Sequence, residues 1–132
     1  MEFEVSFKDA KEILKYYYGK MYPNHEVADI NYYYSKAKRY ALTGIDSDNS
    51  PIMVYVICAE IKLIKRVGDK ILRMSVTKDN DTLVDDLKKA LSEAYETEID
   101  YIWMPEPYEL ENISSKKMIA YPKSHKTFIK GW

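Results

Sequence analysis

Histidine, cysteine and grouped carboxylates are the side chains best able to do acid–base, nucleophilic or metal chemistry, and this chain offers few of them in a useful spacing. His25 and His125 are its only histidines, and neither belongs to a spacing associated with a known mechanism. Cys58 is the only cysteine and lies in an apolar run, where burial suppresses thiolate chemistry. We therefore expect solvated histidines, a structural cysteine, no cofactor and, on balance, a protein without catalytic activity.

One run of oxygen-bearing side chains, at residues 46–50, is similar to the start of a calcium-binding loop. Pro51 stands where such a loop needs glycine, and Ile57 stands where it needs a bidentate glutamate. The same residue types also form tight turns by bonding to their own backbone. We expect a turn here and no metal site.

An enzyme or small-ligand site assembled from scattered residues is kept as a third alternative. Such residues would meet only in the folded chain. The candidates are His25, Tyr40, Asp46, Glu60 and His125.

Tyrosine is the most unusual component, with 13 among 132 residues. Successive residues of a helix turn by about 100°, so Tyr17 can join an apolar stripe while Tyr16 and Tyr18 point partly outward. Tyrosine is enriched in recognition surfaces because it gives a large contact area at low entropic cost. We expect a partner-binding surface that includes Tyr16, Tyr18, Tyr32 and Tyr33. Alternatively, tyrosine replaces scarce leucine and phenylalanine at the rim of a small core.

Charge is unevenly distributed, although the net charge of −1 excludes a uniformly electropositive molecule. Residues 77–111 hold 11 acidic and 3 basic side chains, whereas residues 1–76 hold 10 and 12. Several acids lie off the apolar stripe of the helix expected at 79–95 and would meet a basic partner surface, unless they only complement the helix dipole. These partner-binding candidates are Asp85, Asp86, Glu93, Glu96 and Glu98.

The segment 112–132 holds five basic and no acidic side chains, interleaved with aromatic rings. Lysines for phosphates and rings for base stacking are typical of single-stranded nucleic-acid binders. Alternatively, this segment folds back against the acidic one. The nucleic-acid candidates are Lys116, Lys117, Tyr121, Lys123 and Lys126.

The N-terminal part predicts a short strand followed by a helix. Residues 2–5 alternate polar and apolar, and Ser6 precedes apolar residues at helical spacing from Phe7 to Tyr18. We expect Gly19 to end this helix in the left-handed conformation. Residues 26–37 fit a helix by spacing and a strand by their tyrosines, and we favour a short helix.

The rest of the chain predicts mostly strands around one helix. Residues 40–45 and 51–57 form two strands about the turn, the second being central and covered on both faces. Gly68 and Asp69 connect a hairpin of residues 61–67 and 70–76. An amphipathic helix follows at 79–95, then a strand at 99–104 and a last strand at 117–121 or 127–129.

These elements predict an α+β fold, with a mainly antiparallel sheet of about four to six strands and two or three helices packed on one face. The length favours a single domain, 1–132. The longest apolar run, eight residues, is far below the roughly 20 needed to span a bilayer, so we expect no membrane contact. An acidic N-terminus without a secretion signal and a single cysteine favour the cytoplasm.

The function that fits these features best is that of a small, non-enzymatic interaction protein. Its size and divided charge suit an accessory protein of a virus or mobile element, one that binds and inhibits a host nuclease or nucleoprotein with a basic surface. A nucleic-acid-binding protein that uses residues 112–132 is the alternative. Exposed tyrosines and edge strands also favour a homodimer.

Overall fold

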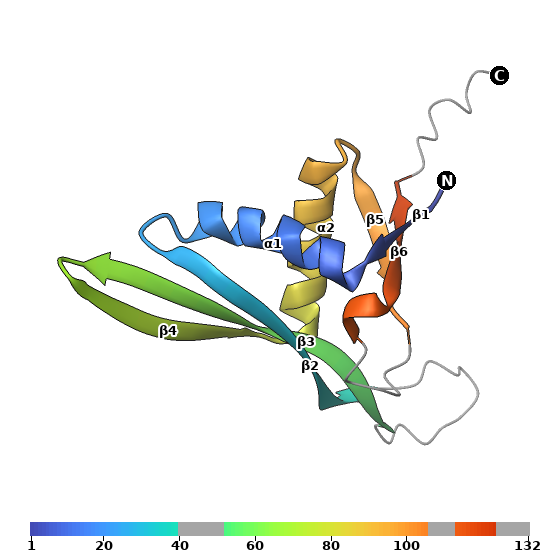
Figure 1. The fold of residues 1–132 in the computed structure, drawn as a ribbon. Coiled ribbons are helices and arrows are strands. Elements are labelled where there is room, and N and C mark those ends of the chain that lie inside the picture. The colour runs from blue at the N-terminus through green and yellow to red at the C-terminus, as the bar shows by residue number, and fades with distance from the viewer. Residues whose placement is uncertain (40–51, 106–112, 124–132) are drawn as a thin grey trace.

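The computed structural model describes residues 1–39, 52–105 and 113–123. Within these ranges the chain forms an α+β fold with two α-helices and two three-stranded antiparallel sheets (Figure 1). The elements in chain order are β1 (Phe3–Ser6), α1 (Phe7–Met21), β2 (Glu26–Arg39), β3 (Ile52–Val67), β4 (Lys70–Lys78), α2 (Asn80–Ala94), β5 (Ile99–Trp103), the 3-10 turn η1 (Ile113–Ser115) and β6 (Lys117–Pro122).

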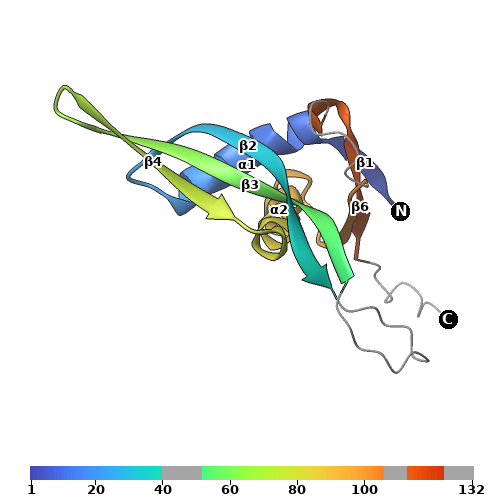
Figure 2. The same ribbon diagram turned by 90° about the horizontal axis from the view of Figure 1, so that it is seen from below.

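The strands belong to two sheets, so the expected single sheet is corrected in this detail. The larger sheet has the order β2-β3-β4, and the smaller has the order β1-β6-β5. The smaller sheet joins the N-terminal strand to the last described strand, with Phe3 opposite Ala120. Figure 2 shows the strands of the larger sheet in front of both helices, so one of its faces is left open.

The hydrophobic core lies between the two helices and the covered faces of both sheets. Helix α1 contributes Phe7, Ala10, Leu14 and Tyr18, which recur at the spacing of one helix face. The other main contributors are Ile30, Ile57, Ala59, Ile61, Leu63, Leu83, Leu87, Leu91, Met118 and Ala120. Cys58 is buried, as expected from its apolar run.

Both helices begin where the sequence predicts, and a side chain caps the N-terminus of each. The Ser6 side chain accepts a hydrogen bond from the Asp9 backbone N–H at 3.0 Å, and Asp79 does the same for Thr82 at 2.9 Å. The prediction for Gly19 is wrong, because α1 continues to Met21 and Gly19 is not left-handed. The extra turn lets Lys20 reach Glu93 on α2.

Gly19→Ala is expected to raise the free energy of unfolding by about 0.5–1 kcal/mol, because alanine loses less backbone entropy in a helix. A Cβ at this position would meet no atom within 4 Å. Urea denaturation measures the effect. Gly68→Ala is the matched control, since Gly68 has a φ of +65° that disfavours alanine. A gain in stability for Gly68→Ala, or a loss for Gly19→Ala, would contradict this account.

Residues 26–39 form a strand, so the predicted short helix at 26–37 is wrong. Val27 lies opposite Leu63 and Ile30 lies opposite Ile61, with a β-bulge between Val27 and Asp29. The bulge puts Val27 and Ile30 on the same face although they are three residues apart. A spacing of three residues is typical of a helix, but the pairing with β3 shows that this segment is a strand.

Strand β3 is central, as predicted, but it is not covered on both faces along its length. Its residues 57–59 are buried, whereas Ile52, Met53 and Tyr55 are at least half exposed. The predicted hairpin is confirmed, with Val67 opposite Lys70 around Gly68. Strands at 99–103 and 117–122 are also as expected. The strand and turn expected at 40–50, and the alternative strand at 127–129, lie outside the described residues.

Neither helix in the described parts of the chain is long and apolar enough to cross a membrane.

Candidate functional site

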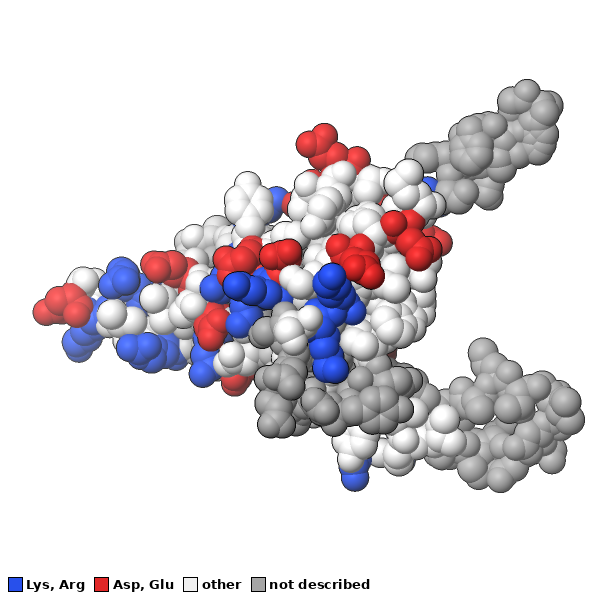
Figure 3. All heavy atoms as spheres, turned by 45° about the vertical axis from the view of Figure 1, so that its right-hand side comes forward, with Lys and Arg blue, Asp and Glu red and all other residues white. Residues whose placement is uncertain are grey.

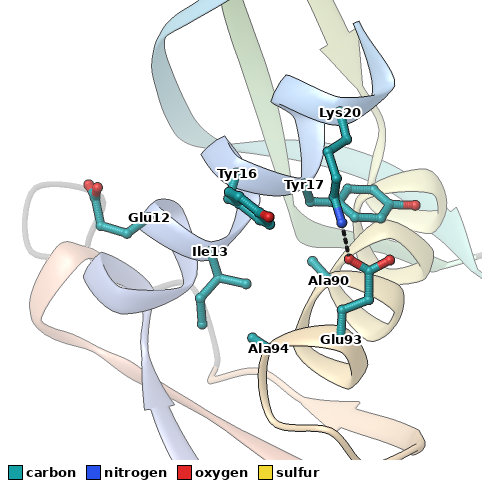
Figure 4. A pocket seen from close by; sticks show the side chains of 8 residues that line it. All are labelled: Glu12, Ile13, Tyr16, Tyr17, Lys20, Ala90, Glu93 and Ala94. Atoms are coloured by element: carbon teal, nitrogen blue, oxygen red, sulfur yellow. Dashed lines mark hydrogen bonds and ion pairs between the residues drawn. The ribbon is translucent and has the colours of Figure 1, made fainter. Parts of the chain in front are cut away.

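The two helices form a groove between them on the described surface. It measures about 480 Å³. We call it the interhelical groove (Figure 4). It is lined by Glu12, Ile13, Tyr16, Tyr17 and Lys20 of α1 and by Ala90, Glu93 and Ala94 of α2.

Small residues on one helix and large residues on the other create the groove. Ala90 and Ala94 are four residues apart on α2 and so lie on the same face, where their methyl groups leave space. On the opposite wall, Ile13 and Tyr17 are partly buried against the core. The floor is therefore apolar, as in most binding clefts.

A hydrogen bond between the two helices crosses the rim of the groove. Lys20 Nζ on α1 donates a hydrogen bond to Glu93 Oε1 on α2, and this contact raises the pKa of Lys20. The same ammonium group lies 4.9 Å from the centre of the Tyr16 ring. Figure 4 shows Lys20 reaching across to Glu93 beside Tyr16. Tyr16 remains 72% exposed, so its ring is positioned without being covered.

Two of the predicted partner-binding residues, Tyr16 and Glu93, thus meet in this groove through Lys20. Glu12 on the same rim lies 3.6 Å from Lys15. Each charged side chain that lines the groove therefore has an ion-pair partner in the same chain.

Tyr18 and Asp86 are buried, so the expectation that they form part of an exposed surface is wrong. Tyr18 is fully buried, and Asp86 is only 6% exposed. Tyr18 Oη donates a hydrogen bond to Asp86 Oδ2 at 2.7 Å, which joins α1 to α2 in the core. Burial, together with this hydrogen bond to Asp86, raises the pKa of Tyr18 well above its usual range. Their role is to fix the packing of the two helices beneath the groove.

The other predicted acids are exposed but mostly paired with lysines of the same chain. Asp85 lies 3.2 Å from Lys89, and Glu98 lies 3.7 Å from Lys123. Glu96 follows the C-terminal end of α2 with a φ of 51°, where the Thr97 backbone N–H bonds to the Ser92 carbonyl at 3.2 Å. The acidic face is therefore less free than expected.

The tyrosines at 32–34 do not line the interhelical groove. Tyr32 faces the core, where its hydroxyl donates to the Phe7 carbonyl at 3.1 Å and its ring packs edge-on against Phe7. Tyr33, the next residue of β2, lies on the other sheet face opposite Cys58. Alternation along the strand thus separates two residues that we expected in one surface.

The described part of the basic C-terminal segment is held against the body of the protein. Lys117 lies 3.3 Å from Glu4, Lys123 pairs with Glu98, and the Tyr121 ring lies 5.7 Å from that of Tyr101. Only the contacts of Lys123 and Tyr121 join it to the acidic segment 77–111, as the alternative expects, whereas Lys117 pairs outside that segment. Lys116 is partly exposed, and Lys126 lies outside the described residues.

Of the scattered residues of the third alternative, the structure describes only His25 and Glu60, and these two do not line the same cleft. His25 borders a cleft of about 240 Å³ with Lys65 and Arg73, and Glu60 does not line it. Tyr40, Asp46 and His125 lie outside the described residues. Among the described residues, no three His, Cys, Asp or Glu side chains are grouped so that they could hold a metal ion.

Comparison with protein families, with characterised proteins and with solved structures found no match to this chain.

One charged surface was missed by the sequence reasoning. Residues 61–78, which we call the basic hairpin, hold six basic side chains and one acidic side chain. The signal was available, but counting charge over residues 1–76 averaged it with the acids of the N-terminal part. The hairpin projects from the body (Figure 1), and the tapering part of the molecule in Figure 3 shows basic and some acidic side chains among uncharged ones.

Proposed function

We propose that this protein is a non-enzymatic binding protein whose interhelical groove takes a segment of a protein partner. The observation that carries the proposal is the exposed Tyr16 ring, held in place over an apolar groove by the Lys20–Glu93 bridge. An aromatic ring ordered before binding loses little entropy when a partner covers it, which is why such rings often dominate binding energies.

The side chains that line the groove indicate which kind of partner segment would fit it. Ile13, Tyr17, Ala90 and Ala94 offer an apolar floor for one aliphatic or aromatic side chain. The α2 wall belongs to a stretch, residues 79–105, with eight acidic and two basic side chains. A segment with basic residues flanking an apolar one complements both features.

The wider role proposed is the one that the sequence favours. A partner with a basic surface, such as a nuclease or a nucleoprotein of a host cell, fits this groove, and the protein would then act as an accessory protein that blocks it. A second copy of this chain is the competing occupant, and the test below separates the two.

The test compares capture by groove variants with capture by a matched control. Ala94→Trp fills the groove from an exposed position, and Tyr16→Ala removes the ring. Tyr55→Ala is the control, because Tyr55 is also exposed and has Lys36 at 5.8 Å from its ring. The immobilised proteins are exposed to lysate of the native host, and any captured protein is purified and titrated.

We expect a protein that binds wild type and Tyr55→Ala equally and binds both groove variants at least about tenfold more weakly, which corresponds to about 1.4 kcal/mol. Three results would overturn the proposal: no capture, capture that the groove variants retain, or a wild-type dimer in sedimentation that Ala94→Trp dissociates. The last result would assign the groove to a second copy of the chain.

A further inference from the structure

The basic hairpin extends past the third strand of its sheet as a two-stranded ribbon. Glu26, the first residue of β2, lies opposite Ile64, so beyond this point only β3 and β4 pair with each other. The ribbon turns at Gly68 and points away from both helices (Figures 1 and 2).

Both faces of this ribbon carry the same mixture of side chains. Residues directly opposite each other share a face, and each successive pair combines one cation with one aliphatic residue. A strand that packs on a core would instead place its aliphatic residues on one face. The pairs are Ile64 with Arg73, Lys65 with Leu72, Arg66 with Ile71 and Val67 with Lys70.

The cations of the ribbon are available to a ligand. Arg66 lies 3.8 Å from Glu26, the closest carboxylate to any of them among the described residues. Lys62, Lys65, Lys70 and Arg73 are exposed and have no carboxylate within 4.0 Å in the described parts of the chain. Between them, Val67, Ile71, Leu72 and Met74 are each more than 40% exposed.

We propose that the basic hairpin binds duplex DNA by entering its major groove. This groove is about 12 Å wide and admits a two-stranded β-ribbon. Cations on both faces of the ribbon would meet the phosphates of the two groove walls, and the aliphatic side chains at its tip would contact base edges. The proposal does not depend on the interhelical groove, none of whose lining residues belongs to the hairpin.

The positive charge of the hairpin and the shape of the nucleic-acid groove favour duplex DNA over other molecules that could bind this surface. A second copy paired along β4 would bring two strongly basic ribbons together, which like-charge repulsion disfavours. Duplex RNA has a deep and narrow major groove that side chains cannot read, so the ribbon fits B-form DNA better. An acidic protein remains an outcome of the test.

The first experiment titrates a labelled duplex DNA with the full chain over a range of salt concentrations. Four to five phosphate contacts predict that log K falls with log salt at a slope of about −4 and that affinity drops about 250-fold between about 50 mM and 200 mM salt. The triple variant Lys65→Gln, Lys70→Gln, Arg73→Gln is expected to bind at least about tenfold more weakly at low salt, with a slope nearer to −1.

The matched control removes the same charge elsewhere. The triple variant Lys116→Gln, Lys117→Gln, Lys123→Gln neutralises the described lysines of the C-terminal segment and should leave binding within about twofold of wild type, because Lys117 and Lys123 are already paired. Thermal unfolding of each variant confirms that it is folded, as expected for exposed positions.

A second variant tests the aliphatic tip. The double variant Ile71→Ser, Leu72→Ser is expected to lose about tenfold in affinity at fixed salt without changing the salt slope, since it removes apolar contact and no charge. The proposal is overturned if duplex DNA does not bind at low salt, if single strands or duplex RNA bind more tightly, if only an acidic protein binds, or if the control triple rather than the hairpin triple abolishes binding.

Discussion

Tyr18→Phe is expected to lower the free energy of unfolding by about 2–3 kcal/mol at neutral pH. The substitution removes only the hydroxyl that donates to Asp86 at 2.7 Å, and the ring keeps its place in the core. Asp86 is then left buried without that donor, and an unsatisfied buried acceptor costs more than a lost surface hydrogen bond. Urea denaturation followed by circular dichroism measures the change.

Tyr17→Phe is the matched control for this prediction. Tyr17 precedes Tyr18 on the same helix but is only partly buried, and its hydroxyl makes no hydrogen bond with the described residues. Its loss should change the free energy of unfolding by no more than about 0.5 kcal/mol. Equal effects of the two substitutions would show that the Tyr18–Asp86 bond does not hold the helices together.

A double variant separates the hydrogen bond from the cost of burial. In the Tyr18→Phe background, Asp86→Leu replaces the orphaned carboxylate with an apolar group, and we expect it to recover at least about 1 kcal/mol. Failure to recover would mean that overpacking by leucine outweighs the relief of the buried charge.

The parts of the fold that the sequence predicts correctly are those encoded by neighbouring residues. Ser6 and Asp79 cap helices whose apolar faces recur every three or four residues. Gly68 supplies the positive φ that the hairpin turn requires. These features depend on contacts within a few positions, so they can be inferred before the fold is known.

The errors arise where distant residues decide the outcome. Asp86 was assigned to the exposed side of its helix, although it lies three residues after Leu83 on the buried face. A carboxylate is stable there because Tyr18, 68 residues away, donates a hydrogen bond to it. The division into two sheets depends on β1 pairing with β6, which joins opposite ends of the described chain. In β2, a single bulge makes strand spacing imitate helix spacing.

The candidate site was predicted in pieces. Tyr16 and Glu93 were expected to bind a partner for separate reasons, and only the packing of α1 on α2 shows that Lys20 joins them. The basic hairpin could have been found from the sequence by counting charge over the two strands of the hairpin. Sequence reasoning located the aromatic and acidic components but not their common groove.

Two parts of the described chain have opposite charge. The basic hairpin lies at the end of the larger sheet, whereas the acidic residues follow α2 and β5. Under the two proposals, a protein partner that is itself bound to DNA would meet both surfaces at once. Two modest affinities would then combine, because the second contact becomes intramolecular once the first has formed.

The second prediction with a large effect is that the folded chain loses stability in alkaline solution. Burial raises the pKa of both Tyr18 and Tyr32 well above the ordinary value of 10.0 in the folded chain. In the unfolded chain both hydroxyls lose their protons near pH 10. Because the folded pKa is the higher one, the stabilisation is intact below pH 10 and is lost as the pH rises towards the folded pKa.

Each such tyrosine reduces the free energy of unfolding by about 1.4 kcal/mol per pH unit above pH 10, so the two together remove about 5 kcal/mol between pH 9 and pH 12. That is comparable with the whole stability of many domains, roughly 5–15 kcal/mol. The raised pKa values of Lys20 and Lys89 act in the same direction, but both side chains are exposed and screened by solvent.

Urea denaturation at successive pH values, with tyrosinate absorbance recorded in parallel, measures this loss. Tyr32→Phe is the decisive variant, because it removes one of the two titrating hydroxyls and breaks only one neutral hydrogen bond, to the Phe7 carbonyl. We expect it to start less stable by about 1 kcal/mol at neutral pH and to lose stability half as steeply above pH 10. An unchanged slope would mean that the Tyr32 hydroxyl ionises in the folded chain as readily as in the unfolded one.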